Sequence, residues 1–186
     1  GKNRPVLYLN MEEYSGFDSL FGKNFPANLS DLLYYVRQGE QNLTARINSM
    51  VQTVGQLDFI PPVQSPLDIR GTPWQDWICL IREIMLHSPY ETLILDIGNG
   101  LDEVFQILDM CGRIYMPVLP DKMSCCKLAQ FENLLRILEY PQILTKIRRL
   151  QLPFHSELEK SDFYVDQLPW SNLGDYVKEL IRKEMI

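Results

Sequence analysis

The segment Glu91–Gly100 limits most strongly what this chain can fold into. Four residues suited to β-structure, Thr92–Leu95, lead into an acid, Asp96, and Gly98 and Gly100 follow almost at once. A short apolar run that ends in glycines is typical of a buried strand in a parallel sheet. Open α/β sheets bind their ligands at the carboxyl ends of the strands, so this pattern predicts an acid that faces a ligand.

An acid in this place has the layout of a Walker B strand, which holds the magnesium ion of a bound nucleotide. The structural alternative is that Asp96 caps a helix near Leu101 or bonds the Gly98–Gly100 turn. The phosphate loop Gly-x-x-x-x-Gly-Lys-[Ser/Thr] occurs nowhere in the sequence. Gly16–Lys23 comes near it, but five residues separate its glycines and Asn24 replaces the hydroxyl residue. This segment is therefore not a phosphate loop.

Strand and helix patterns alternate along the chain. Strands are expected at Val6–Leu9, Leu57–Ile60, Thr92–Leu95, Arg113–Val118 and around Arg149–Leu152. Helices are expected at Leu29–Val36, Thr72–His87, Leu101–Cys111, Met123–Glu139 and Leu173–Met185, with loops at Tyr14–Asn28 and Asp162–Asn172. This alternation predicts an α/β three-layer sandwich with a mainly parallel sheet. We expect residues 1–186 to form a single domain.

Composition excludes several classes of protein. The chain is 46% hydrophobic, as globular proteins are, and no apolar run is long enough to span a bilayer. Its net charge of −6 argues against binding nucleic acid over the whole surface. Four scattered cysteines and two histidines form no zinc motif and indicate free thiols in a cytoplasmic protein. The basic cluster Lys146–Arg149 is interpreted as a solvated helix end or strand edge rather than a polyanion site.

A second acid, Glu12, follows the first expected strand. If the two strands are parallel neighbours, Glu12 and Asp96 meet at one edge of the sheet, where carboxylates can position magnesium through water and orient an attacking water. Glu12 and Glu13 could equally form a solvated turn. Gly98 and Gly100 could let a backbone amide approach a phosphate, or could simply make a tight turn.

The order of these segments resembles the MinD/ParA-type P-loop ATPases, including their pilus-assembly relatives. Val6–Glu12 with Phe17–Gly22 is similar to the second strand of that family and the short segment after it. Leu57–Pro62 resembles the next strand, and Tyr90–Gly100 resembles the Walker B and switch II segment. Asp109–Pro120 is similar to the following strand.

The resemblance assigns roles to individual residues. It implies that Asp96 contacts magnesium through water and that Gly100 lies near the γ-phosphate. Asn10 and Glu12 occupy the positions of two catalytic aspartates that help to hold magnesium and the attacking water. Asn10 is neutral and Glu12 is one methylene longer than aspartate, and both departures put hydrolysis in question.

The first strand of the family, with its phosphate loop, is absent from this sequence. We expect the chain to be truncated at its N-terminus, with a gap in the sheet, a rearranged sheet, or pairing with another copy. The resemblance implies ATP and Mg²⁺ as cofactors of the intact protein, none bound by this chain alone, and a homodimer. The negative net charge argues against nucleic-acid partners, the balanced charges of the final helix argue against a membrane partner, and the free thiols indicate the cytoplasm. The resemblance also implies a nucleotide-dependent switch in cellular positioning or in pilus- or septum-type assembly, and an ATPase only if a phosphate loop lies upstream. The alternative is a non-catalytic interaction domain on the same fold; a small-molecule enzyme would need a nucleophile–base pair that the sequence does not show.

Overall fold

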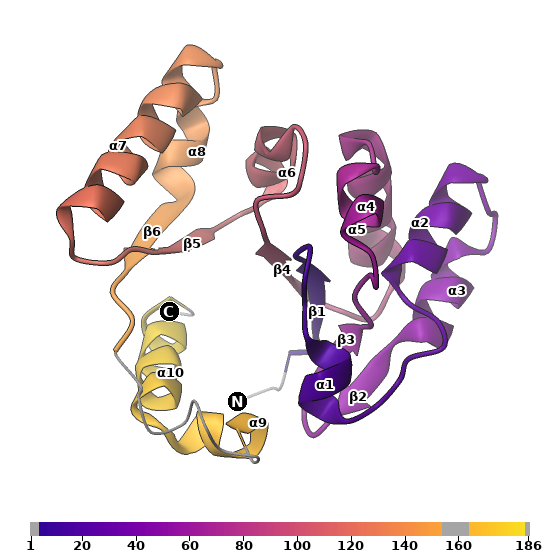
Figure 1. Ribbon diagram of the computed structural model, residues 1–186. Helices are drawn as coiled ribbons and strands as arrows, with labels where there is room; N and C mark the ends of the chain where they lie inside the picture. Colours follow the sequence, from indigo (N-terminus) through magenta and orange to yellow (C-terminus); the bar gives the residue numbers. More distant parts are fainter. Residues whose placement is uncertain (1–3, 154–163, 185–186) are drawn as a thin grey trace. The chain divides into compact units, whose positions relative to one another are not determined.

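The computed structural model describes residues 4–153 and 164–184. The chain divides into two compact units, residues 1–107 and 108–186, which are considered separately. Whether they form the single domain expected from the sequence stays a prediction. In the first unit the elements are β1 (Val6–Met11), α1 (Phe17–Phe21), α2 (Leu29–Arg37), α3 (Leu43–Met50), β2 (Gln52–Val54), β3 (Leu57–Ile60), α4 (Pro66–Arg70), α5 (Trp74–His87), β4 (Thr92–Ile97) and α6 (Val104–Met110), which runs into the second unit (Figure 1).

The sheet of the first unit has the strand order β2-β3-β1-β4. β1 lies in its interior and pairs in parallel with β3 and with β4, while β2 adds an antiparallel edge. The prediction of a mainly parallel sheet is confirmed. Among the described strands, β4 has β1 on one side and no neighbour on the other.

The two faces of this sheet carry different cores. Side chains alternate between the faces of a strand, so the leucines and Met11 of β1 point one way and Tyr8 and Asn10 the other. The larger core joins the first set to α2, α3, α4, α5 and α6. The opposite face carries a cluster of aromatic residues from α1, its flanking loop and β3: Phe17, Phe21, Phe25 and Phe59.

α1 lies within a segment expected to be a loop. It is only five residues long, and Gly16 and Gly22 flank it with left-handed backbone angles, φ 66° and 59°. Such angles suit glycine because an L side chain is strained there. The rejected phosphate-loop candidate is therefore a short helix between two glycine termini, held by its aromatic side chains.

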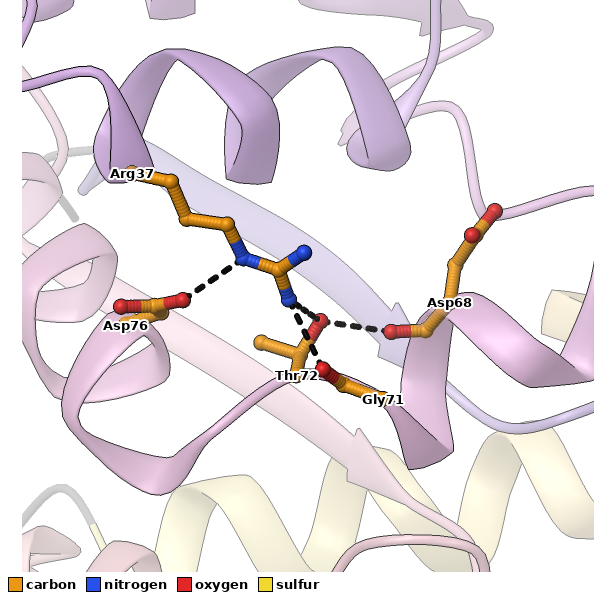
Figure 2. A network of polar contacts seen from close by, with 5 residues as sticks. All are labelled: Arg37, Asp68, Gly71, Thr72 and Asp76. Atoms are coloured by element: carbon orange, nitrogen blue, oxygen red, sulfur yellow. Dashed lines mark hydrogen bonds and ion pairs between the residues drawn. The ribbon is translucent and has the colours of Figure 1, made fainter.

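Arg37 ties α2 to the turn between α4 and α5 (Figure 2). Its Nε donates to Asp76 Oδ2 at 2.8 Å, and its Nη2 donates to the Gly71 carbonyl at 3.0 Å and to Thr72 Oγ1 at 2.9 Å. The Thr72 hydroxyl, in a residue only 3% exposed, donates in turn to the Asp68 carbonyl. One guanidinium thus joins the end of α4 to the start of α5.

Replacing Arg37 with methionine is expected to lower the free energy of unfolding by about 1–3 kcal/mol, since three hydrogen bonds are lost while much of the side-chain volume remains. The ion pair itself contributes little because the arginine side chain is 44% exposed. Arg37→Lys should recover only part of the loss, because a single ammonium group cannot reproduce the planar guanidinium, which donates through two nitrogens at once. Urea denaturation followed by circular dichroism measures the effect. The exposed Arg82, changed to methionine, is the control; equal losses would contradict this role for Arg37.

The second unit is built from β5 (Ile114–Pro117), α7 (Lys122–Ile137), α8 (Pro141–Lys146), β6 (Ile147–Leu150), α9 (Tyr164–Gln167), the 3₁₀ turn η1 (Leu168–Trp170) and α10 (Asn172–Glu184). β5 and β6 pair in parallel as a separate two-stranded sheet, with Ile114 opposite Ile147. The expected loop at 162–172 is wrong from residue 164 onward, because α9 and η1 occupy it; its first two residues lie outside the described part.

The periodicity of the sequence predicts an apolar inner face for α7, formed by Leu128, Phe131, Leu134, Leu135 and Leu138. This face is only partly buried, and Leu128 and Phe131 are half-buried. Leu135 is buried, but Leu134 and Leu138 are 39% and 43% exposed. The helix itself is confirmed, but its periodicity predicted only some of the buried positions correctly.

Candidate functional site

The carboxyl ends of β1 and β4 lie side by side. The two strands are parallel, with Asn10 opposite Asp96 and Met11 opposite Ile97. Residues in register on neighbouring parallel strands present their side chains on the same face. The expectation that the two strand ends meet at one edge of the sheet is confirmed.

The Asp96 carboxylate is held at one oxygen. The Tyr8 hydroxyl donates a hydrogen bond to Oδ2 at 2.5 Å. Within the described residues no hydrogen bond to Oδ1 is found, and Asp96 is only partly buried. Burial and this bond to Asp96 raise the pKa of Tyr8 well above its usual value, which keeps the hydroxyl protonated.

Asn10 is 2% exposed and uses both ends of its amide. Its Oδ1 accepts the Glu12 backbone N–H at 3.0 Å, and its Nδ2 donates to the Tyr8 hydroxyl oxygen at 3.3 Å. An aspartate here would lack the N–H donor and would place a second charge beside Asp96. The neutral side chain therefore suits this network, while its assignment to catalysis stays a prediction.

Glu12 lies beyond the end of β1, in an exposed position. Partial desolvation, and after it the negative charge of Asp96, raise the pKa of the Glu12 carboxyl. The two acids expected at this edge are therefore near enough to repel each other. A bound cation would relieve this repulsion, and the catalytic assignment of Glu12 stays a prediction.

The two glycines after β4 are approached closely by the loop after β1. A Cβ at Gly98 would lie 3.2 Å from Glu12 Cα, and one at Gly100 would lie 2.4 Å from Glu13 Cγ. Glu13 crosses Gly100 and accepts a hydrogen bond from Arg70 Nε at 2.6 Å. Glycine at 100 thus makes room for this side chain; its assigned role beside a phosphate stays a prediction.

The donor set suits a water-mediated contact to Mg²⁺ rather than a cage built by the chain. Within the described ranges no group of three or more His, Cys, Asp or Glu residues could hold a metal ion. Mg²⁺ commonly keeps several waters and is bound through one or two carboxylates together with phosphate oxygens. The Oδ1 atom of Asp96, which Tyr8 does not bind, fits that kind of coordination together with the nearby Glu12.

Sequence reasoning missed Tyr8, Glu13 and Arg70. Tyr8 could have been predicted, because it lies two residues before Asn10 and side chains two apart share one face of a strand. The contact between Glu13 and Arg70 joins segments 57 residues apart, so no local sequence pattern predicts it.

The basic cluster of the second unit is paired internally. Lys146 bonds Asp109, Arg148 pairs with Glu184, and Arg149 pairs with Glu132. Arg148 and Arg149 side chains remain 50% and 59% exposed. They line a hollow of about 590 Å³ together with Arg136 and both glutamates, so three arginines face two acids there. The interpretation of the cluster as a solvated edge stays a prediction.

No protein-family model matches the sequence, and no curated protein matches it. Solved structures do match in their fold. A ParA family ATPase from Chlorobium tepidum TLS superposes with a TM-score of 0.65 and 17% identity, over 90% of this chain and 69% of that one. Cobyrinic acid a,c-diamide synthase from Mycobacterium smegmatis superposes with a TM-score of 0.53 and 12% identity, over 90% of this chain and 68% of that one.

The fold is therefore that of the P-loop nucleotide hydrolases, an α/β fold with a mainly parallel sheet. More narrowly, it is the MinD/ParA-like form of that fold. At these identities the likeness shows the fold alone. None of the described helices is long and apolar enough to cross a membrane.

Proposed function

We propose that this chain is part of a ParA-like, nucleotide-dependent switch in which Asp96 faces the Mg²⁺ of bound ATP. The observation that carries the proposal is the register of Asn10 with Asp96, which brings two strand ends and their acids to one edge of the sheet. The fold supports it, since the ParA family ATPase shares this arrangement of strands and helices over most of the chain.

The free edge of β4 supports a further part of the proposal. Among the described strands β4 pairs only with β1. Parallel strands are normally covered and paired on both sides, because an open edge leaves backbone donors and acceptors unmatched. We propose that sequence outside these 186 residues supplies a phosphate-binding strand along this edge.

On this proposal the present chain binds ATP weakly or not at all by itself, since the backbone amides and lysine of a phosphate loop supply most of the phosphate binding. In the intact protein, ATP would bridge two copies and loss of the γ-phosphate would release them. Such a switch would serve cellular positioning or the assembly of a pilus or septum in the cytoplasm.

A second candidate is a non-catalytic interaction domain on the same fold. Asn10 favours it, because its amide is fully engaged with Tyr8 and Glu12 and carries no charge for a metal or a water. Both candidates bind nucleotide through the same edge; they differ in whether ATP is turned over.

Titration of the natural full-length protein with ATP tests the proposal. Asp96→Ala is expected to weaken Mg·ATP binding about tenfold or more while leaving ATP binding in EDTA unchanged, because metal-site carboxylates act only when the metal is present. Asp58→Ala is the matched control, an aspartate of the same sheet that also accepts a tyrosine hydroxyl, at 3.1 Å from Tyr90. Turnover in the wild type selects the ATPase and binding without turnover selects the second candidate. Failure of the wild type to bind nucleotide would refute both.

A further inference from the structure

Tyr8 is fixed in place by its ring and by its hydroxyl. The ring stacks on Phe17 of α1, with the centroids 5.8 Å apart and the planes 6° from parallel. The hydroxyl lies between the Asn10 amide and the Asp96 carboxylate. Neither the fold nor the sequence motifs assign this residue a function.

The direction of each hydrogen bond in this chain of contacts is determined. Asn10 Oδ1 accepts the Glu12 N–H, so the other end of the amide is the donor and points to Tyr8. A tyrosine hydroxyl has a single hydrogen, and because its oxygen already accepts from Asn10, that hydrogen is free to go to Asp96 Oδ2. The backbone of the Glu12 loop is thereby linked through two side chains, Asn10 and Tyr8, to one carboxylate oxygen of Asp96.

The consequence concerns the other oxygen of Asp96. With Oδ2 held by Tyr8, the carboxylate cannot turn freely, and Oδ1 is the oxygen that this bond leaves for another partner at the sheet edge. Groups that hydrogen-bond a metal-binding carboxylate orient it, and losing them commonly costs 10–100-fold in metal affinity.

We propose that Tyr8 is a positioning residue for Asp96, which holds the carboxylate so that Oδ1 faces a divalent cation bound with the nucleotide phosphates. This inference rests on the proposed function. It also explains Asn10, whose amide secures the Tyr8 hydroxyl in a way that an aspartate could not.

The test compares Tyr8→Phe with Tyr90→Phe in the natural full-length protein. Tyr90 is a matched control, since its hydroxyl also donates to an aspartate, Asp58, at 3.1 Å. Affinity for Mn²⁺ in the presence of ATP is measured by electron paramagnetic resonance, and affinity for ATP is measured in EDTA. Tyr8→Phe is expected to weaken Mn²⁺ binding about tenfold with ATP binding in EDTA unchanged, whereas Tyr90→Phe changes neither.

A purely structural role would alter stability and both affinities together, so this split separates positioning from folding. Mn²⁺ affinity that is equal or higher in Tyr8→Phe overturns the inference. If Asp96→Asn also leaves Mn²⁺ affinity unchanged, the proposed function itself fails. If Asp96→Asn weakens Mn²⁺ binding and Tyr8→Phe does not, only the inference about Tyr8 fails.

A metal-free measurement covers the case in which Tyr8→Phe does not fold. The ¹³Cζ resonance of Tyr8 in the wild-type chain reports its hydrogen bond, and Asp96→Asn should shift it while Asp58→Asn shifts that of Tyr90. If the chemical shift of Tyr8 does not change in Asp96→Asn, the hydroxyl does not hold this carboxylate and the inference is overturned.

Discussion

Replacing Trp77 with alanine is expected to lower the free energy of unfolding by about 3–5 kcal/mol, the usual cost of removing a large aromatic side chain from a core. Trp77 is 0% exposed and joins α5 to the larger core. Because small domains are stable by only about 5–15 kcal/mol, this loss should leave the first unit marginally folded at 25 °C. Denaturation in urea, followed by circular dichroism, measures it.

Two variants show whether burial causes the effect. Trp170 is 84% exposed, so Trp170→Ala should cost well under 1 kcal/mol despite the Lys178 ammonium over its ring. Trp77→Phe should cost less than Trp77→Ala, since it keeps a ring and removes the indole Nε1, which is buried without a hydrogen-bond partner in the described structure. Similar losses for Trp77→Ala and Trp170→Ala would contradict the packing described for α5.

Replacing Phe59 with alanine is expected to cost about 3–5 kcal/mol and to loosen α1. Phe59 is 0% exposed, and its ring meets those of Phe17, Phe21 and Phe25 at centroid distances of 5.4, 5.5 and 5.6 Å. Each such pair contributes about 0.5–1.5 kcal/mol beyond simple burial. Because Tyr8 stacks on Phe17, loss of this cluster should also free the Tyr8 hydroxyl from Asp96.

Limited trypsin digestion measures the release of α1. Lys23 lies two residues after this helix and is exposed, so Phe59→Ala should speed cleavage after Lys23 under conditions in which the rest of the first unit stays intact. Tyr14→Ala, at a side chain that is 77% exposed, is the control and should leave both stability and cleavage unchanged. Unchanged cleavage in Phe59→Ala would show that the aromatic cluster does not hold α1.

The sequence predicted the elements whose signals are local. β3 and the end of α5 match their expected ranges. Pro61 directly follows the strand, and the backbone N–H of Ser88 caps α5 by donating to the Ile84 carbonyl. The start of α2 matches its expected range, but the sequence pattern also suggests Ser30 as the cap, whereas Asn28 caps the helix and forms a capping box with Asp31. The short elements α1, α3, β2 and α4 were missed, because helices and strands of this length depend on packing rather than on periodicity.

The location of the candidate site could be predicted from the sequence, but its side-chain hydrogen bonds could not. The strand-end rule predicted that the strands carrying Asp96 and Glu12 end at one edge, and the register of Asn10 with Asp96 confirms that the two strand ends meet. The contacts of Tyr8 with Asp96 and of Glu13 with Arg70 join residues 88 and 57 positions apart. Side-chain hydrogen bonds over such separations depend on how the strands are aligned, which a single sequence does not specify.

Amide hydrogen exchange across β4 of the natural full-length protein, with and without Mg·ATP, tests most directly whether this strand is an interior strand beside a nucleotide. The account predicts that amides of Thr92–Ile97 are protected there although they are partly unpaired in the present chain, and that Mg·ATP slows exchange further from Asp96 to Gly100. Exchange along β4 as fast as at an open sheet edge, and unchanged by Mg·ATP, would contradict it.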